Sequence, residues 1–249
     1  MYVGIVRPTS FPRTLAAVVL ALAARAAHGD VVTQFDGSRL LVVGDEQPDT
    51  VTIDPTPGGI LVTGSNGTLV DGGLAPVLVS GVRRVSFELH GGSDRVTVNA
   101  VDLPDGIGMR LGNGNDEAVV NGARLGKTKI RTGNGNDAVW VADAQAQRLY
   151  VQTNTGWDAV VVHDSWVPGD LQVSTGSDED YVEIAGTEVG NDVRMRLGND
   201  DDDLFLADVA FDDDTRLDGS HGDNGLFFAG YIWFGDELDI HDFGDDWWW

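Results

Sequence analysis

Cysteine is absent from this chain of 249 residues, and basic residues are scarce, with 16 lysines and arginines against 40 aspartates and glutamates. Without cysteine, disulfide scaffolds and thiolate-based zinc or redox sites are excluded. The formal net charge of −24 excludes nucleic acid and anionic membrane surfaces as partners, because both would repel the protein. Glycine, by contrast, is abundant at 33 residues, and 42% of the chain is hydrophobic. This composition is too apolar for a disordered protein and is typical of a turn-rich β fold.

The N-terminal segment carries the pattern of an export signal. Arg7 and Arg13 precede an apolar run from Thr14 to Ala24, which leads into the small residues of Ala24-Arg25-Ala26. The run is too short to cross a bilayer, which needs about 20 apolar residues. A basic region, a short apolar region and an Ala-x-Ala end are typical of a Sec signal peptide. We therefore predict a signal peptide over residues 1–29, no membrane span, and a protein that is secreted, periplasmic or held at the cell surface.

One aspartate recurs at an almost constant interval. The spacing is 21 or 22 residues, and the series is Asp94, Asp116, Asp137, Asp158, Asp180, Asp202 and Asp223. Apolar residues stand two and four positions after each aspartate, and seven and nine positions before it, in most copies. Because this alternation has a period of two, it predicts two short strands per repeat, each with one buried face.

The length of the repeat decides between architectures. A βαβ unit needs 30 or more residues, and the chain shows no helical periodicity. Two strands of about five residues and two turns fill the 21 or 22 positions of each repeat. Each repeat is therefore predicted to form one coil of a parallel β-solenoid, with strands of neighbouring coils about 4.8 Å apart. A third short strand in the far turn is compatible with this spacing.

The same offsets recur more weakly upstream, at Leu40, Val42, Asp49, Val51 and Ile53. Residues 58–82 resemble a further degenerate coil that contains a Gly/Pro-rich loop. We predict an all-β, single-domain parallel β-solenoid, of the β-roll or β-helix type, with about eight or nine coils. Degenerate coils would occupy residues 30–84 and regular repeats residues 85–226. An aromatic cap and an acidic tail would occupy residues 227–249, because a solenoid must cover its last open coil.

Glycine and asparagine surround the repeated aspartate, most clearly in Gly112-Asn113-Gly114-Asn115-Asp116 and Gly133-Asn134-Gly135-Asn136-Asp137. Stacked coils would bring equivalent carboxylates about 4.8 Å apart. Ionised carboxylates at that separation repel by roughly 3–4 kcal/mol per neighbouring pair at an effective dielectric constant of 20. These turns contain no lysine or arginine to offset the repulsion, so the sequence predicts a bound cation.

Calcium is the cation that suits these donors. Carboxylates, asparagine carbonyls and backbone carbonyls are hard oxygen ligands, of which Ca²⁺ takes six to eight, whereas softer metals prefer histidine or cysteine. Glycine permits the positive φ angles that turn backbone carbonyls inward. The predicted Ca²⁺ ligands are Asp94, Asn113, Asn115, Asp116, Asn134, Asn136, Asp137, Asp158, Asp178, Asp180, Asn199, Asp200 and Asp202.

At these turns the chain resembles the haemolysin-type, RTX-like calcium-binding repeat, whose nonapeptide is Gly-Gly-x-Gly-x-Asp-x-apolar-x. Residues 111–119 and 132–140 match all but the first glycine, and residues 91–96 form a shorter version. The resemblance covers about residues 88–206. It implies a parallel β-roll whose successive turns bind Ca²⁺ through the aspartate and backbone oxygens. This chain departs from the family in having one motif per 21 or 22 residues instead of one per nine, so calcium would lie along one edge only.

Two alternatives remain open from the residues. Gly-Asn-Gly-Asn-Asp can form tight turns with stacked side chains in a metal-free structural solenoid. A β-helix polysaccharide lyase or hydrolase would have coils of similar length, but it needs long loops that build a cleft, and here the far turn is short. No nucleophile-elbow, P-loop or zinc-protease motif occurs. We therefore expect a non-enzymatic calcium-binding solenoid that serves as a surface, matrix or adhesion module.

Three residues after the aspartate, neighbouring coils carry Val119, Trp140 and Val161. In a stacked solenoid these side chains would lie next to one another on the outer surface. We predict that they form an exposed apolar stripe, which is a candidate contact for a protein or polysaccharide partner.

Overall fold

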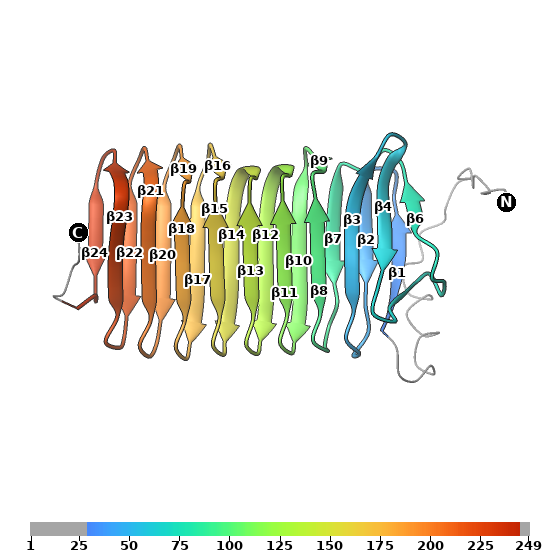
Figure 1. Cartoon of the computed structure of the whole chain (residues 1–249), viewed down its shortest axis with the longest axis horizontal. Helices are drawn as coiled ribbons and strands as arrows, with labels where there is room; N and C mark the ends of the chain where they lie inside the picture. The colour runs from blue at the N-terminus through green and yellow to red at the C-terminus, as the bar shows by residue number, and fades with distance from the viewer. Residues whose placement is uncertain (1–28, 245–249) are drawn as a thin grey trace.

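A computed structural model describes residues 29–244. These residues form 24 strands and no helix, and the strands stack into one elongated solenoid (Figure 1). The predicted all-β parallel solenoid is therefore confirmed. The predicted signal peptide and the last five residues lie outside the described part of the chain, apart from Gly29 at its boundary.

The first face of the solenoid consists of the strands that precede the repeated aspartates. They run parallel and keep one register from coil to coil. They are β2 (Arg39–Val43), β7 (Arg84–Glu88), β10 (Gly106–Asn113), β12 (Arg124–Asn134), β14 (Gln145–Thr155), β17 (Leu171–Ser177), β20 (Val193–Gly198), β22 (Thr215–Ser220) and β24 (Leu238–His241).

The second face consists of the strands that follow the aspartates, also parallel and in register. They are β3 (Thr50–Thr56), β8 (Arg95–Asn99), β11 (Glu117–Asn121), β13 (Ala138–Ala142), β15 (Ala159–His163), β18 (Tyr181–Ala185), β21 (Asp203–Phe211) and β23 (Gly225–Phe234).

A narrow third face closes the coil between the second face and the next strand of the first. Its separate strands are β9 (Asp102–Leu103), β16 (Trp166–Val167) and β19 (Glu188–Val189). In other coils the same positions belong to the beginning of β12 and β14 or to the end of β21. The sequence predicts two strands per coil and leaves the third open, because two residues are too few to show an alternating pattern.

The predicted apolar columns fill the interior. Met109 pairs with Phe87 on one side and Ile130 on the other, and all three side chains are buried. Each coil repeats the arrangement, so one continuous core runs the length of the molecule. Complete burial of an aliphatic side chain contributes about 1.5–3 kcal/mol to stability. The alternation in the sequence therefore determines both the strands and the side of each strand that faces inward.

The N-terminal region contains one coil of the solenoid and a set of strands that cap it. Residues 39–53 form a coil in the predicted register, since β2 and β3 pair in parallel with β7 and β8. The prediction of a further coil over residues 58–82 is wrong. There β4 (Gly59–Gly64) returns antiparallel along β3, and β6 (Val77–Val79) returns along β4, because the Gly/Pro-rich turn reverses the chain.

The rest of the cap is β1 (Asp30–Phe35), which runs antiparallel to β2, and β5 (Leu69–Val70), which pairs with β1. Together β1 and β4 occupy the outer edges of β2 and β3. These edges would otherwise present unpaired backbone groups to other chains.

The aromatic C-terminal segment is the last coil of the solenoid. β23 and β24 pair in parallel with β21 and β22 and continue the register of the repeat as far as His241. The Phe234 ring contacts Phe211 at 5.8 Å and Phe228 at 6.3 Å between centroids, which closes the end of the core. The regular stack thus extends past the predicted boundary at residue 226.

Candidate functional site

The repeated aspartates form a ladder along the edge where the first face turns into the second. From Asp94 onward, one carboxylate oxygen, Oδ1, of each aspartate accepts the backbone N–H of the aspartate in the preceding coil. The distances are 2.8–2.9 Å for Asp49–Asp94, Asp94–Asp116, Asp116–Asp137, Asp137–Asp158, Asp158–Asp180 and Asp180–Asp202. Each side chain therefore satisfies a buried backbone donor of its neighbour, and the hydrogen bonds link seven coils.

The ladder ends at Asn224, which corrects the predicted series. The N–H of Asp202 donates to Oδ1 of Asn224 at 2.9 Å, 22 residues along the chain. Asp223 is exposed, and its own N–H bonds to Oδ1 of Asp201 at 2.8 Å. The chain replaces the last aspartate by an amide that offers the same acceptor oxygen. The hydrogen bond of the ladder thus does not require a charge.

Every aspartate of the ladder is buried, with an exposed fraction between 0% and 4%. In each of them the second carboxylate oxygen is buried and has no hydrogen-bond partner within residues 29–244. These atoms are Oδ1 of Asp49 and Oδ2 of Asp94, Asp116, Asp137, Asp158, Asp180 and Asp202. A buried polar atom without a partner costs about 1–3 kcal/mol, and more when it is charged. A column of such carboxylates therefore requires protons or cations to neutralise its charge.

Burial raises the pKa of all these carboxyl groups, because desolvation disfavours the charged form. The charge of neighbouring ladder carboxylates raises several of these pKa values further. The backbone N–H bonds lower them, as do the hydroxyl groups of Thr132, Thr153 and Thr175 at Asp137, Asp158 and Asp180. The pKa is about 8 for Asp94 and Asp180, about 7 for Asp49 and Asp202, about 6 for Asp116 and Asp158, and raised also for Asp137. The pKa values of these carboxyl groups therefore lie close to neutral pH, where the groups gain or lose protons.

The predicted asparagine ligands form separate ladders on the surface of the turns. Nδ2 of Asn134 donates to Oδ1 of Asn113 at 2.8 Å, and the N–H of Asn136 donates to Oδ1 of Asn115 at 3.0 Å. Asn134 and Asn136 accept equivalent bonds from the next coil. Each of the four amide oxygens thus accepts a hydrogen bond from another coil, which leaves it one further lone pair.

Comparison with protein families, with curated proteins and with solved structures finds no match for this chain. The resemblance to RTX-like repeats rests on the turn motifs alone, while the structure establishes coils of about 22 residues and a stacked aspartate ladder. Residues 29–244 contain no helix that is long and apolar enough to cross a membrane.

The remaining predicted ligands lie outside the ladder. Asp178 and Asp200 occupy the position where Gly135 stands in the strongest motif, and both adopt positive φ angles, of 76° and 74°. The N–H of Asp178 bonds to Oδ2 of Asp200 at 3.3 Å, and Nδ2 of Asn199 bonds to Oγ of Ser177 at 3.3 Å. These side chains stabilise the stacking of the turns at the surface.

Glycine permits this stacking in the strongest motifs. Gly135 has a φ of +127°, and a Cβ placed on it would lie 2.0 Å from the carbonyl oxygen of Gly114 in the preceding coil. No side chain fits in that space. The Gly-Asn-Gly motif is therefore required by the close approach of two backbones, whether or not a cation is bound.

A second acidic group lies where the chain enters the first face. Asp192, Asp213 and Asp214 each offer an oxygen, and the three oxygens lie within 4.8 Å of one another. This group could hold a metal ion, although Asp192 already pairs with Arg194 at 2.6 Å. Asp192 was not predicted as a ligand, but the 22-residue interval that separates it from Asp214 is the signal that could have revealed the pair.

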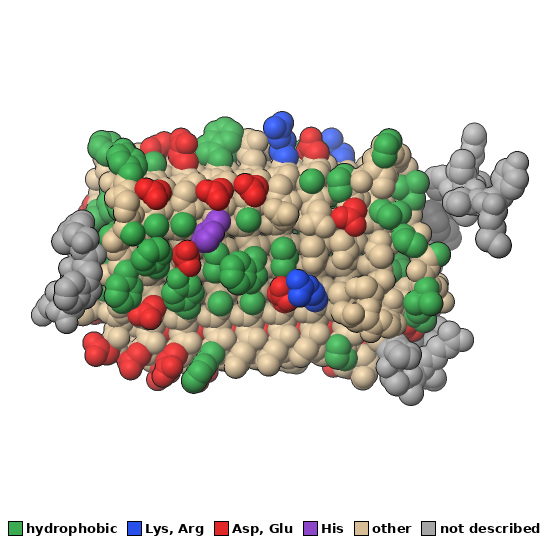
Figure 2. Space-filling model, in the orientation of Figure 1, with side chains coloured by type: hydrophobic (Ala, Val, Ile, Leu, Met, Phe, Trp, Pro, Cys, Tyr) green, Lys and Arg blue, Asp and Glu red, His purple; other side chains and the backbone are tan. Residues whose placement is uncertain are grey.

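The predicted apolar stripe is present only in part. Val119, Trp140 and Val161 are aligned on the second face as expected. Trp140 is 45% exposed, but Val161 is only 4% exposed because its neighbours cover it. Apolar side chains nevertheless gather on this face towards the C-terminal half (Figure 2).

Proposed function

We propose that this protein is a secreted, non-enzymatic β-solenoid whose aspartate ladder binds Ca²⁺, and that it serves as a surface, matrix or adhesion module. The observation that carries the proposal is the column of seven buried aspartates, each with one carboxylate oxygen that lacks a partner. Such oxygens are hard anionic donors, which suit Ca²⁺.

The ladder has no internal counter-charge. None of the ion pairs formed by residues 29–244 includes a ladder aspartate. Asp116 and Asp137, with the backbone carbonyls of their glycine turns, would hold the cation. Bound calcium would neutralise the column and couple binding to folding. Extracellular modules bind Ca²⁺ at about 10⁻⁴–10⁻³ M, so sites of this strength would fill only after export.

A metal-free ladder is the second candidate, and Asn224 favours it. This residue performs the same hydrogen bonding with a neutral side chain, and its Nδ2 donates to the carbonyl of Asp242 at 3.0 Å. A protonated aspartate is likewise neutral. In that case the ladder would be purely structural, and protons would take the place of calcium.

Thermal unfolding followed by circular dichroism distinguishes the candidates. The mature chain would be melted at pH 7.5 in millimolar Ca²⁺ and in EGTA, beside the double variant Asp116→Asn/Asp137→Asn. The control is Asp223→Asn, which changes an exposed aspartate next to the ladder. Calcium should raise the melting temperature of the wild type and of the control by several degrees, and that of the double variant by clearly less.

An unchanged melting temperature of the wild type in millimolar Ca²⁺ would show that calcium is not structural. The metal-free ladder would then predict that the double variant is more stable than the wild type in EGTA at pH 8, because an amide needs no proton to remain neutral. Hydrolase or lyase activity on polysaccharides would contradict the non-enzymatic part of the proposal.

A further inference from the structure

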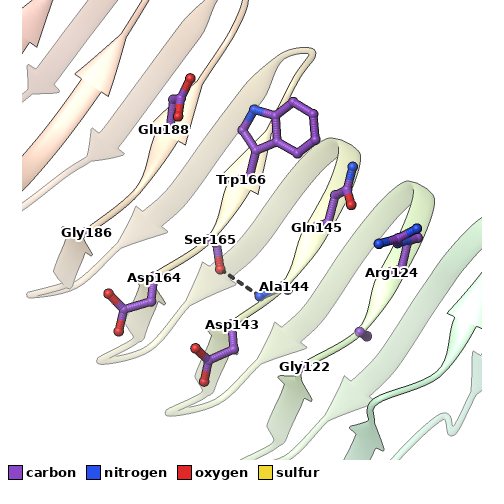
Figure 3. A pocket seen from close by; sticks show the side chains of 11 residues that line it. Gly122, Arg124, Asp143, Ala144, Gln145, Asp164, Ser165, Trp166, Gly186 and Glu188 are labelled. Carbon is purple, nitrogen blue, oxygen red and sulfur yellow. Dashed lines mark hydrogen bonds between the residues drawn. The ribbon is translucent and has the colours of Figure 1, made fainter.

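A shallow groove follows the corner where the second face meets the third. It has a volume of about 400 Å³ and is lined by equivalent residues of four successive coils (Figure 3). Its floor consists of the small buried residues Ala123, Ala144 and Ser165. The N–H of Ala144 donates to Oγ of Ser165 at 3.2 Å, which ties two coils together beneath the groove. The groove therefore runs along the solenoid axis and repeats with the spacing of the coils.

One wall carries a row of exposed or half-exposed side chains, one from each coil. The strand pairing places Gln145 between Arg124 and Trp166, and Glu188 follows Trp166 (Figure 3). The Trp166 ring is 45% exposed. Within residues 29–244, the side chains of this row make no hydrogen bond or ion pair with the protein. A planar amide, a guanidinium, a carboxylate and an indole N–H are thus all free to bind a ligand.

The other wall carries Asp143 and Asp164, with Gly122 and Gly186 in the flanking coils. All four residues have φ angles between 46° and 62°, a region that glycine adopts at the least cost. The backbone does not require aspartate at this position, because glycine serves in the adjacent coils. Both carboxylates are exposed and have no partner within residues 29–244, so they are free acceptors along the opposite edge of the groove from the Trp166 row (Figure 3).

The chemistry of the groove defines its ligand. Three carboxylates and one guanidinium give it a net negative charge, which disfavours anionic polymers, as does the charge of −24 on the whole chain. An exposed indole can stack on the flat C–H face of a pyranose ring, while planar carboxylates and amides bind its hydroxyl groups. A groove that repeats about every 4.8 Å suits a ligand that also repeats. We propose that the groove binds a linear neutral glycan that lies along the solenoid axis.

This site is separate from the aspartate ladder. The ladder lies at the start of the second-face strands, and the groove lies at their end. Substitutions in the groove should therefore leave the effect of calcium on unfolding unchanged. Loss of glycan binding and loss of the calcium effect are distinguishable outcomes.

The test is affinity gel electrophoresis of the folded full chain in calcium buffer. The gels contain hydroxyethylcellulose, barley β-glucan, xyloglucan or galactomannan as neutral polymers, and alginate as an anionic one. Trp166→Ala removes the aromatic wall, and Trp157→Ala is the control, because Trp157 is also exposed, at 62%, but lies in a turn beside the aspartate ladder. Circular dichroism confirms that each variant is folded.

We expect at least one neutral polymer to retard the wild type and Trp157→Ala equally. Trp166→Ala should weaken that binding about tenfold or more, and Asp143→Asn/Asp164→Asn by a smaller factor. Three results would overturn the proposal: no retardation by any neutral polymer, retardation by alginate alone, or binding that Trp166→Ala leaves unchanged. Trp140→Ala tests the apolar stripe separately: if it abolishes binding and Trp166→Ala does not, the ligand contacts the second face instead and the proposal fails.

Discussion

The backbone N–H of Asp116 donates a 2.8 Å hydrogen bond to Oδ1 of Asp137, while Oδ2 of Asp137 is buried without a partner. One side chain thus performs a structural task with one oxygen and leaves the other oxygen for a proton or a cation. Because the relationship repeats along the ladder, the stability of the solenoid should respond to both pH and calcium.

Asp137→Ala and Asp137→Asn should have different effects. Alanine removes the acceptor and leaves the buried N–H of Asp116 unpaired, which should lower the free energy of unfolding by about 1–3 kcal/mol. Asparagine retains an acceptor oxygen, as Asn224 does. Urea unfolding in EGTA measures both variants. Equal destabilisation by alanine and asparagine would show that the hydrogen bond contributes little.

Metal-free protein should lose stability as the pH rises. Burial raises the pKa of Asp94 and Asp180 to about 8, and that of Asp116 to about 6, from the ordinary 3.8. The folded state therefore binds these protons more tightly than the unfolded state. Their contribution to stability is complete below about pH 4 and is lost as the pH rises through 6 to 8.

Urea midpoints in EGTA should accordingly be lower at pH 8 than at pH 4.5. Millimolar Ca²⁺ should restore stability at pH 8 and have little effect at pH 4.5, where protons already occupy the ladder. A metal-free midpoint that increases with pH would mean that the ladder aspartates are not desolvated as the structure indicates.

Gly135→Ala should destabilise the protein more than Gly37→Ala. Both glycines have positive φ angles, of +127° and +101°, so alanine is strained at each. At Gly37 a Cβ meets nothing within 4 Å, whereas at Gly135 it lies 2.0 Å from the carbonyl oxygen of Gly114. We expect Gly37→Ala to cost about 1 kcal/mol from strain alone, and Gly135→Ala to cost clearly more. Denaturant midpoints of similar size would contradict the close stacking of the turns.

Phe211→Ala should loosen the C-terminal end of the solenoid selectively. The Phe211 side chain is fully buried and contacts Phe234, and its truncation should cost about 3–5 kcal/mol locally. Because each coil contacts only its neighbours, the loss should remain near β23 and β24. Hydrogen exchange should show reduced protection there and unchanged protection in β10 to β13. The control Trp233→Ala removes a ring that is 50% exposed, and it should have a small effect.

The fold was predictable because its information is local and repeated. Alternation on both sides of each aspartate sets the two main strands, and the constant interval places Met109 beside Ile130 without reference to the rest of the chain. Asp49 could be assigned to its column for the same reason, and its N–H bonds to Asp94 as the register requires. The sequence left a third short strand open but could not place it, since the separate strands β9, β16 and β19 contain only two residues each.

The candidate site was predictable in its residues but not in its geometry. The sequence placed Asp116 and Asp137 in one column, yet it could not show that one oxygen of each points to a backbone N–H of the adjacent coil. It also could not show that the amide oxygens of Asn113 and Asn115, which it predicts as calcium ligands, accept hydrogen bonds from the next coil. Such contacts join residues 21 or 22 positions apart, so the pattern of residues within a single repeat does not predict them.

By itself, the sequence determined the coil length, the register and the strand faces that form the core, because hydrophobic alternation and backbone geometry operate within a single repeat. Only the tertiary structure decided which way the aspartates turn, how the N-terminal strands reverse to cap the stack, and that Trp166, Asp143 and Asp164 line one groove. These features depend on pairs of residues in different coils or on a change of chain direction. The contacts that stabilise these features form only when the coils are stacked.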